Sequence, residues 1–86
     1  MELVSLHTLA RTEEGRPLWL TYKLLCHQGR YGILCYLEGV DPVRHPHSTA
    51  AIEDLCSSRR EAERLLRRLA QRAVTPQHLP DLIWEM

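Results

Sequence analysis

The chain has 86 residues, 44% of them hydrophobic and 26% charged, and its 11 basic side chains balance its 11 acidic ones. A chain of this length supports one domain with one core, and this composition is typical of a folded protein rather than a disordered one. A formal net charge of zero removes the general electrostatic argument for nucleic-acid binding. We therefore expect a single domain over residues 1–86.

The cysteines and the N-terminal residues bear on the cellular compartment. Cys26, Cys35 and Cys56 are an odd number of cysteines without a Cys-x-x-Cys spacing, and the first residues lack the basic start and the apolar run of a signal peptide. No segment approaches the roughly 18 apolar residues that a membrane-spanning helix needs. We expect free thiols, a cytoplasmic location and no association with a membrane.

The first half of the chain alternates apolar and polar residues in short stretches that turn residues separate. Residues 2–10 fit a strand, although the spacing of their apolar residues also suits a helix, so both interpretations stay open. Gly15 tolerates the positive φ of a turn, and residues 17–27 are rich in aromatic and other side chains that favour strands. We interpret residues 2–27 as a hairpin.

Gln28-Gly29 is the next turn signal. Pairing across it places apolar residues opposite one another on one face: Leu20 and Leu37, Tyr22 and Cys35, Leu24 and Ile33, Cys26 and Tyr31. A shift of this register by one residue would turn the whole set toward water. The register across this turn is therefore a more specific prediction than that of the first hairpin.

The second half of the chain changes to helical spacing after a loop. The prolines and histidines around residues 43–48 predict a loop or an irregular edge, and residues 49–55 suit a short fourth strand. Ser58 and Glu61 form a Ser-x-x-Glu capping box, which predicts the start of a helix. The apolar stripe of this helix can cover one face of a sheet and consists of Ala62, Leu65, Leu66, Leu69 and Ala73.

A short C-terminal helix completes the predicted fold. Thr75-Pro76 supplies a cap residue and a proline that a helix accepts at its first position, and the apolar residues that follow suit a short helix. The predicted class is α+β: an antiparallel three- to four-stranded meander over residues 2–55, then one main amphipathic helix and the short helix within residues 58–86.

Four segments resemble those of a known family: Ala51-Ile-Glu-Asp-Leu-Cys-Ser-Ser58, Leu65-Leu66-x-x-Leu69-Ala70, Tyr31-Gly-Ile33 and the tail Val74-Thr-Pro-Gln-His-Leu79-Pro-Asp-Leu-Ile83. Together they resemble a bacterial family described only as a domain of unknown function. The motif Val-Thr-Pro-x-x-Leu in the tail is the most specific point of contact. The resemblance implies a small soluble α+β protein with a meander before a helix, and it implies no activity.

Cysteine and histidine residues are the candidate metal ligands and nucleophiles, namely Cys26, His27, Cys35, His45, His47 and Cys56. Their spacing lacks the paired-ligand pattern of zinc sites, and Cys26 and Cys35 belong to the predicted apolar face. Cys56 precedes the helix, whose dipole favours a thiolate, but no base is identified beside it, so its reactivity stays open. We predict no catalytic residue, metal site, cofactor or small-molecule substrate, and favour a protein that is not an enzyme.

The helix face opposite the leucine stripe carries the arginine arc, which consists of Arg60, Arg64, Arg67, Arg68 and Gln71. The arc is a candidate surface for phosphates or for an acidic protein partner. The alternative is a solvated helix face, on which Glu61 and Glu63 pair with arginines one turn later. We favour the solvated face, because the net charge of zero and the few stacking aromatics speak against nucleic-acid binding.

A second apolar set has the opposite parity on the predicted strands. Trp19, Leu34 and Tyr36 point away from the face that the leucine stripe covers. Either the C-terminal helix with Trp84 covers this second face, or a partner chain does. The sequence thus predicts a non-catalytic protein-interaction or regulatory module, with a homodimer as one form. Nucleic-acid or acidic-partner binding through the arginine arc is the alternative.

Overall fold

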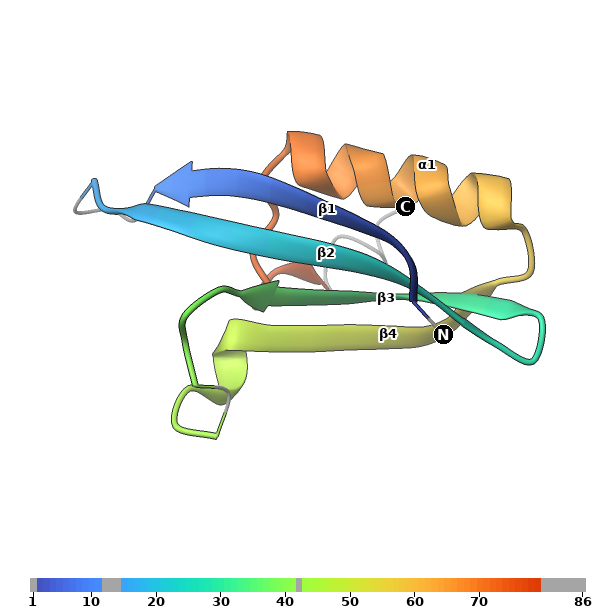
Figure 1. Ribbon diagram of the computed structural model, residues 1–86, viewed down its shortest axis with the longest axis horizontal. Helices are drawn as coiled ribbons and strands as arrows, with labels where there is room; N and C mark the ends of the chain where they lie inside the picture. Colours follow the sequence, from blue (N-terminus) through green and yellow to red (C-terminus); the bar gives the residue numbers. More distant parts are fainter. Residues whose placement is uncertain (1, 12–14, 42, 80–86) are drawn as a thin grey trace.

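The computed structural model describes residues 2–11, 15–41 and 43–79. In these residues four strands form one antiparallel sheet in sequence order: β1 (Glu2–Arg11), β2 (Pro17–His27), β3 (Arg30–Leu37) and β4 (Thr49–Cys56). A short 3-10 helix (Pro46–Ser48) leads into β4, and α1 (Arg59–Gln71) follows the sheet (Figure 1). The α+β class and the fourth strand are confirmed, and the first segment is a strand rather than a helix.

The β2–β3 hairpin has the predicted register. Leu20 pairs with Leu37, Tyr22 with Cys35, Leu24 with Ile33 and Cys26 with Tyr31. Gln28 and Gly29 form the two-residue turn with φ values of 51° and 76°, and two successive residues with positive φ match the right-handed twist of the strands that they join. The turn and the alternation of the side chains therefore specify the same register.

The Ser58 cap and the stripe from Ala62 to Leu69 form as predicted, whereas α1 ends at Gln71, so Ala73 lies beyond the helix. The Ser58 hydroxyl accepts a hydrogen bond from the Glu61 backbone N–H at 3.3 Å, which satisfies one of the free donors of the first turn. Leu66 and Leu69 are buried against the sheet. At the other end of the helix, the Thr8 hydroxyl of β1 donates to the Ala70 carbonyl at 2.9 Å, so this end is tied directly to an edge strand.

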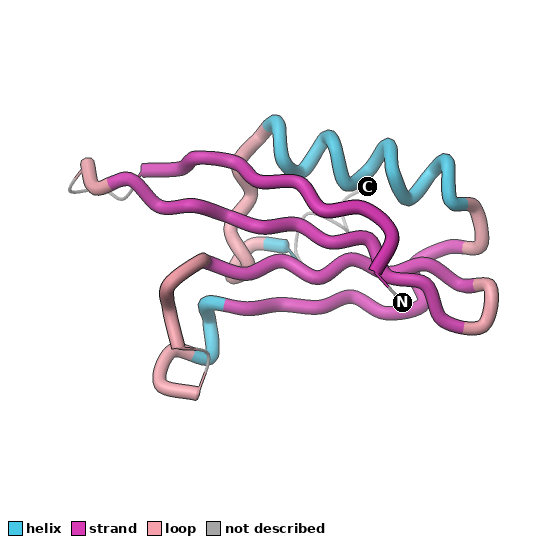
Figure 2. Tube along the Cα trace, in the orientation of Figure 1, coloured by secondary structure: helices cyan, strands magenta, loops and turns pink. Residues whose placement is uncertain are grey.

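The segment after α1 returns along the face of the sheet that the helix covers (Figure 2). Ala73 turns the chain with a φ of 50°, and Val74 and Leu79 are buried in the core. Residues 76–78 form a turn, in which the His78 N–H donates to the Thr75 carbonyl at 3.0 Å, and Leu79, the last described residue, is helical. The rest of the predicted C-terminal helix, residues 80–86, lies outside the described residues.

One carbonyl of this segment bonds to the centre of the sheet. The Tyr22 hydroxyl donates to the Val74 carbonyl at 2.5 Å, and the Cys35 thiol lies 3.8 Å from the same oxygen. Burial raises the pKa of the Cys35 thiol to about 12. The pKa of Tyr22 is raised above its usual range, mainly by burial and to a smaller extent by the nearby Cys35. Both groups therefore stay protonated as donors.

A bulge in β4 brings two backbones close together at Gly32. The β3–β4 register shifts between Tyr31 and Ile33, and Asp54 has a φ of 55°. A Cβ atom at Gly32 would lie 2.5 Å from the Ile52 carbonyl oxygen, which is far inside van der Waals contact. Glycine is thus required here for close approach of the strands rather than for its φ.

Candidate interaction surface

Among the described elements, α1 and the segment after it cover only one face of the sheet. The opposite face, here named the open face, carries the alternate side chains of all four strands. By register it includes Ser5, His7, Leu9, Arg11, Pro17, Trp19, Thr21, Lys23, Leu25, His27, Arg30, Gly32, Leu34, Tyr36, Glu38, Thr49 and Ala51. Three of the four predicted interface residues, Trp19, Leu34 and Tyr36, lie on it. The fourth, Trp84, lies outside the described residues.

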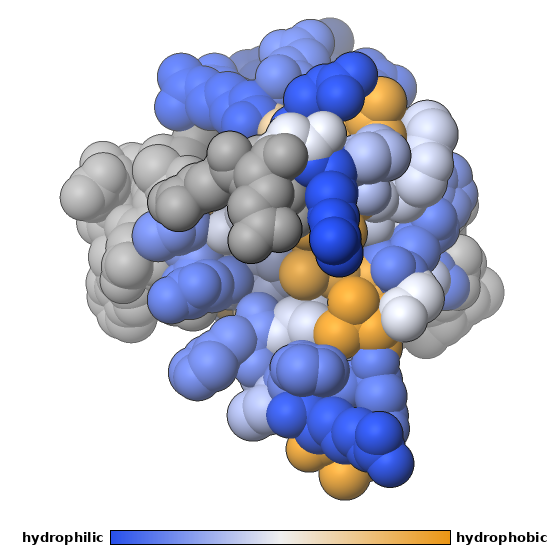
Figure 3. Space-filling view, turned by 90° about the vertical axis from the view of Figure 1, so that its left-hand side faces the viewer, coloured by the Kyte–Doolittle hydropathy of each residue, from blue (hydrophilic) through white to orange (hydrophobic). Residues whose placement is uncertain are grey.

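Leu9 and Trp19 are the most exposed large apolar residues of this face. They are direct partners in the β1–β2 pairing, and they are 45% and 49% exposed. The pairing of β2 with β3 ends at Leu20, so the β1–β2 hairpin extends past the end of β3 (Figure 1). Figure 3 looks at this end of the molecule and shows apolar surface in orange among hydrophilic residues. An exposed pair of large apolar side chains on an uncovered sheet face is a candidate interaction site.

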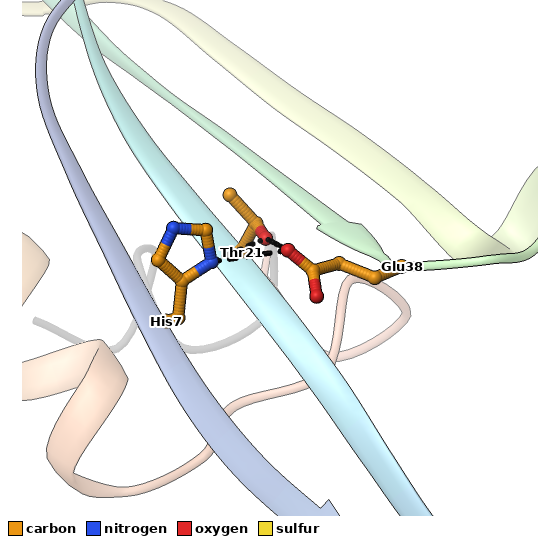
Figure 4. Close-up of polar contacts among 3 residues, drawn as sticks. All are labelled: His7, Thr21 and Glu38. Atoms are coloured by element: carbon orange, nitrogen blue, oxygen red, sulfur yellow. Dashed lines mark hydrogen bonds and ion pairs between the residues drawn. The ribbon is translucent and has the colours of Figure 1, made fainter.

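A polar cluster lies beside this pair and joins β1 and β2 to the residue that follows β3. The Thr21 hydroxyl donates to Glu38 Oε1 at 2.6 Å, and His7 Nδ1 lies 3.0 Å from each of these two oxygens (Figure 4). Because the hydroxyl proton points to Glu38, the His7 Nδ1–H is the donor to the pair. Thr21 has no exposed surface, so its hydroxyl is a structural partner of Glu38 and is not accessible to a substrate.

Sequence analysis missed this polar cluster. His7 and Glu38 are 31 residues apart, and Glu38 follows the last residue of β3. The pairing of His7 with Thr21 depends on the β1–β2 register, which the sequence left open. The sequence does show that His7 and Thr21 are polar residues within strands that also carry many apolar residues, and this pattern could have indicated a polar contact between them.

The centre of the open face is apolar and only partly exposed. Leu34 and Tyr36 are half-buried, and Lys23 lies over the Tyr36 ring with its Nζ 5.6 Å from the ring centroid. At this distance an ammonium group gains a cation–π attraction. The lysine thus covers part of an aromatic side chain that no described helix covers.

A hollow lies at the end of the open face near the β2–β3 turn. Leu25, His27, Arg30, Gly32 and Glu53 are among its lining residues. The bulge of β4 borders it, and the β4 backbone fills the space in which a side chain at Gly32 would stand. Arg30 borders it and forms an ion pair with Asp54 through Nε, while its Nη2 donates to the Asp54 carbonyl at 3.3 Å.

The arginine arc lies on the exposed side of α1, as the helical spacing predicts. Arg60, Arg64, Arg67, Arg68 and Gln71 are all exposed. Glu63 pairs with Arg59, one turn earlier, at 2.9 Å rather than with the later arginine that the sequence suggested. In the described part of the chain, none of the four arginines of the arc forms an ion pair. A shallow hollow lies between Arg60, Glu63, Arg64 and Arg67.

The candidate metal ligands and thiols remain dispersed. In the residues that the structure describes, no group of three or more His, Cys, Asp or Glu side chains could hold a metal ion. Cys35 is buried and Cys56 half-buried, and the Cys56 thiol lies 3.4 Å from the Ser58 carbonyl. His45 and His47 are exposed in the loop before β4. No helix among the described residues is long and apolar enough to cross a membrane.

Comparison with known proteins gives one match. The sequence matches the model of a family of unknown function (DUF6514) over residues 1–86. This match confirms the resemblance to a family of unknown function, whereas the bacterial origin and the tail motif stay predictions. Searches of curated proteins and of solved structures found no match.

Proposed function

Since the chain belongs to this family of unknown function (DUF6514), we propose a role from its surface: a non-catalytic protein-interaction domain that binds a protein partner through the open face. The observation that carries the proposal is the exposed pair of Leu9 and Trp19 on a sheet face that no described element covers. Tryptophan is among the residues that most often supply the binding free energy at protein interfaces.

The surroundings of this pair match the composition of a protein interface. An apolar centre of Leu34 and Tyr36 is bordered by charged and polar side chains, among them Lys23 and Glu38. Interfaces between proteins commonly have an apolar core and a polar rim of this kind. The partner that fits is therefore a protein surface with apolar side chains at its centre and charges of both signs around them.

The polar cluster holds one of the rim charges in place. Glu38 Oε1 accepts hydrogen bonds from Thr21 and His7, which lie on β2 and β1. A carboxylate that is already ordered loses less conformational entropy when a partner binds. We therefore assign the cluster the role of positioning Glu38 on the open face.

The test compares variants of the open face with an apolar residue elsewhere. Leu9→Ala and Trp19→Ala should each weaken binding of a purified and identified partner by roughly tenfold or more in calorimetry. Val43→Ala is the matched control, because Val43 is 88% exposed in a loop away from the sheet, and it should leave the affinity unchanged. Equal affinities of wild type and Trp19→Ala would reject the open face as the binding surface.

The arginine arc supports a second candidate, binding to an acidic protein segment or to nucleic acid. The observation in its favour is that Arg60, Arg64 and Arg67 surround a shallow hollow and have no ion pair in the described part of the chain. Unpaired guanidinium groups on one helix face suit phosphates and carboxylates. The net charge of zero gives this candidate no long-range attraction to nucleic acid.

Salt dependence tests the second candidate. Fluorescence anisotropy with a single-stranded oligonucleotide and with an acidic peptide should show binding that weakens as ionic strength rises. The double variant Arg64→Gln and Arg67→Gln should abolish it, whereas Arg44→Gln, a change at an exposed loop arginine, should not. Absence of binding to both probes at low salt would reject the arc.

A further inference from the structure

The open-face residues of β3 have a pattern that is symmetric about Leu34. Arg30 and Glu38 each stand four residues from Leu34, and Gly32 and Tyr36 each stand two residues from it. From this pattern we infer that the protein bound to the open face is a second copy of the chain, packed face to face about a twofold axis at Leu34. This inference rests on the proposed function and names its partner.

The twofold axis brings opposite charges together twice. Residues an even number apart share one face of a strand, and four residues of strand span about 13 Å. When β3 of one copy crosses β3 of the other in the antiparallel direction, Arg30 of each copy lies opposite Glu38 of the other. Packed sheets cross at about 30°, and both side chains are long enough to meet across that angle.

The two charged groups have atoms free for this contact. Arg30 uses Nε and Nη2 for its bonds to Asp54, and Glu38 uses Oε1 for its bonds to Thr21 and His7. In the described part of the chain, Arg30 Nη1 and Glu38 Oε2 have no bonding partner. The contact between copies therefore forms without breaking a bond within either copy.

The shapes along the same strand are complementary as well. The hollow near the β2–β3 turn, which Arg30 and Gly32 help to line, lies to one side of Leu34, and Tyr36 lies two residues to the other side. The same axis brings the Tyr36 ring of each copy to the side of the other copy on which this hollow lies. A ring seated in such a hollow buries a large apolar area, and its hydroxyl can reach the polar lining of the hollow.

The neighbouring strand follows the same symmetry and accounts for the exposed tryptophan. Lys23 pairs with Leu34 and thus lies near the axis, and Trp19 and His27 each stand four residues from it. Trp19 of one copy then lies over His27 of the other, which covers its exposed ring. The Lys23 ammonium group is directed onto the Tyr36 ring of its own chain rather than at its counterpart. A chain with zero net charge also has no overall repulsion from its copy.

Charge reversal tests the arrangement on the full chain. Sedimentation equilibrium over a range of protein concentrations should show a dimer for the wild type. Arg30→Glu places two acidic groups at each contact, and Glu38→Arg places two basic groups there, so each variant should raise the dimer Kd by roughly tenfold or more.

Mixing the two variants separates this contact from any loss of folding. A mixed dimer of Arg30→Glu with Glu38→Arg contains two attractive pairs, so an equimolar mixture should regain the wild-type dimer affinity. A wild type that remains monomeric at millimolar concentration would overturn the inference. So would a dimer that neither variant weakens, or a mixture without recovery. If Trp19→Ala still abolishes binding to a different identified protein in those cases, the proposed function stands and only the second copy is rejected.

Discussion

The two faces of β2 share one backbone but differ in what surrounds their side chains. On the covered face Leu20, Tyr22 and Leu24 have no exposed surface, whereas on the open face Trp19 is 49% exposed. The covered residues pack against α1 and the segment that follows it. The covered face therefore supplies the stability of the domain, and the open face leaves apolar area for binding.

Thr21 is the exception that clarifies this comparison. It lies on the open face, yet it is fully buried, because the side chains around it and its bonds to Glu38 and His7 enclose it. Burial without a covering helix is thus achieved by polar contacts between strands. The open face accordingly has a hydrogen-bonded polar part and a partly exposed apolar part.

The largest effect on stability is expected from the covered face. Leu66→Ala removes a fully buried side chain of α1 and should lower the free energy of unfolding by about 2–5 kcal/mol. Urea denaturation monitored by circular dichroism measures this loss. Arg67→Ala, at the next position on the exposed side of the helix, is the control and should change the free energy by less than about 0.5 kcal/mol. Equal losses in both variants would contradict the assignment of the faces.

Gly32→Ala gives the largest effect expected on the open face. The added methyl group would meet the Ile52 carbonyl oxygen, and relief of this contact requires β3 and β4 to move apart. We expect a loss of about 1–3 kcal/mol in thermal or urea unfolding. Ala51→Ser, at an exposed position of β4, should stay close to wild type. A neutral Gly32→Ala would show that the bulge adjusts freely.

Alkaline pH provides an intermediate effect that is specific to the covered face. In the unfolded chain a cysteine ionises near pH 8.5 and a tyrosine near pH 10, roughly. In the folded chain the pKa of Cys35 is about 12 and that of Tyr22 is raised further above its usual range. Because the unfolded state then binds fewer protons, stability is fully present below about pH 8.5 and falls as pH rises through these values.

Urea midpoints at pH 7, 9 and 10.5 measure this slope. Tyr22→Phe removes the tyrosine contribution, together with the hydrogen bond to Val74, and should cost about 1 kcal/mol at pH 7. The double variant with Cys35→Ala should lose less stability between pH 7 and 10.5 than the wild type does. An unchanged slope in the double variant would show that other groups cause the alkaline loss.

Trp19→Ala should have the smallest effect on stability. Trp19 is half-exposed, and the cross-strand pair with Leu9 contributes about 0.2–1 kcal/mol. Urea unfolding at low protein concentration isolates this small term. A loss of more than about 2 kcal/mol would place Trp19 in the core and remove the contrast between the faces.

The sequence predicts those parts of the fold that local patterns determine. The β2–β3 register follows from the alternation around Gln28-Gly29, and the start of α1 follows from the Ser58 capping box. Residues 2–10 could not be assigned, because their spacing suits either a strand or a helix, and only pairing with β2 decides between them. Tertiary pairing here overrides a local ambiguity.

The surface was predictable only in its composition. Parity alone places Trp19, Leu34 and Tyr36 on one face, and helical spacing places the arginine arc opposite the leucine stripe. The bonds of Glu38 and the hollow near the β2–β3 turn could not be predicted. They depend on a residue beyond a strand end and on a backbone bulge at Asp54, neither of which leaves a periodic pattern in the sequence.

The bond from Tyr22 to the Val74 carbonyl has a consequence for synthesis on the ribosome. All four strands leave the ribosome before Val74 does. Until then the Tyr22 hydroxyl and the Cys35 thiol of the nascent sheet lack the Val74 carbonyl as their acceptor. Until residues 74–79 leave the exit tunnel, neither side of the nascent sheet is fully sheltered. A translational pause before that point would therefore prolong an intermediate that exposes apolar surface on both faces of the sheet and is prone to aggregate.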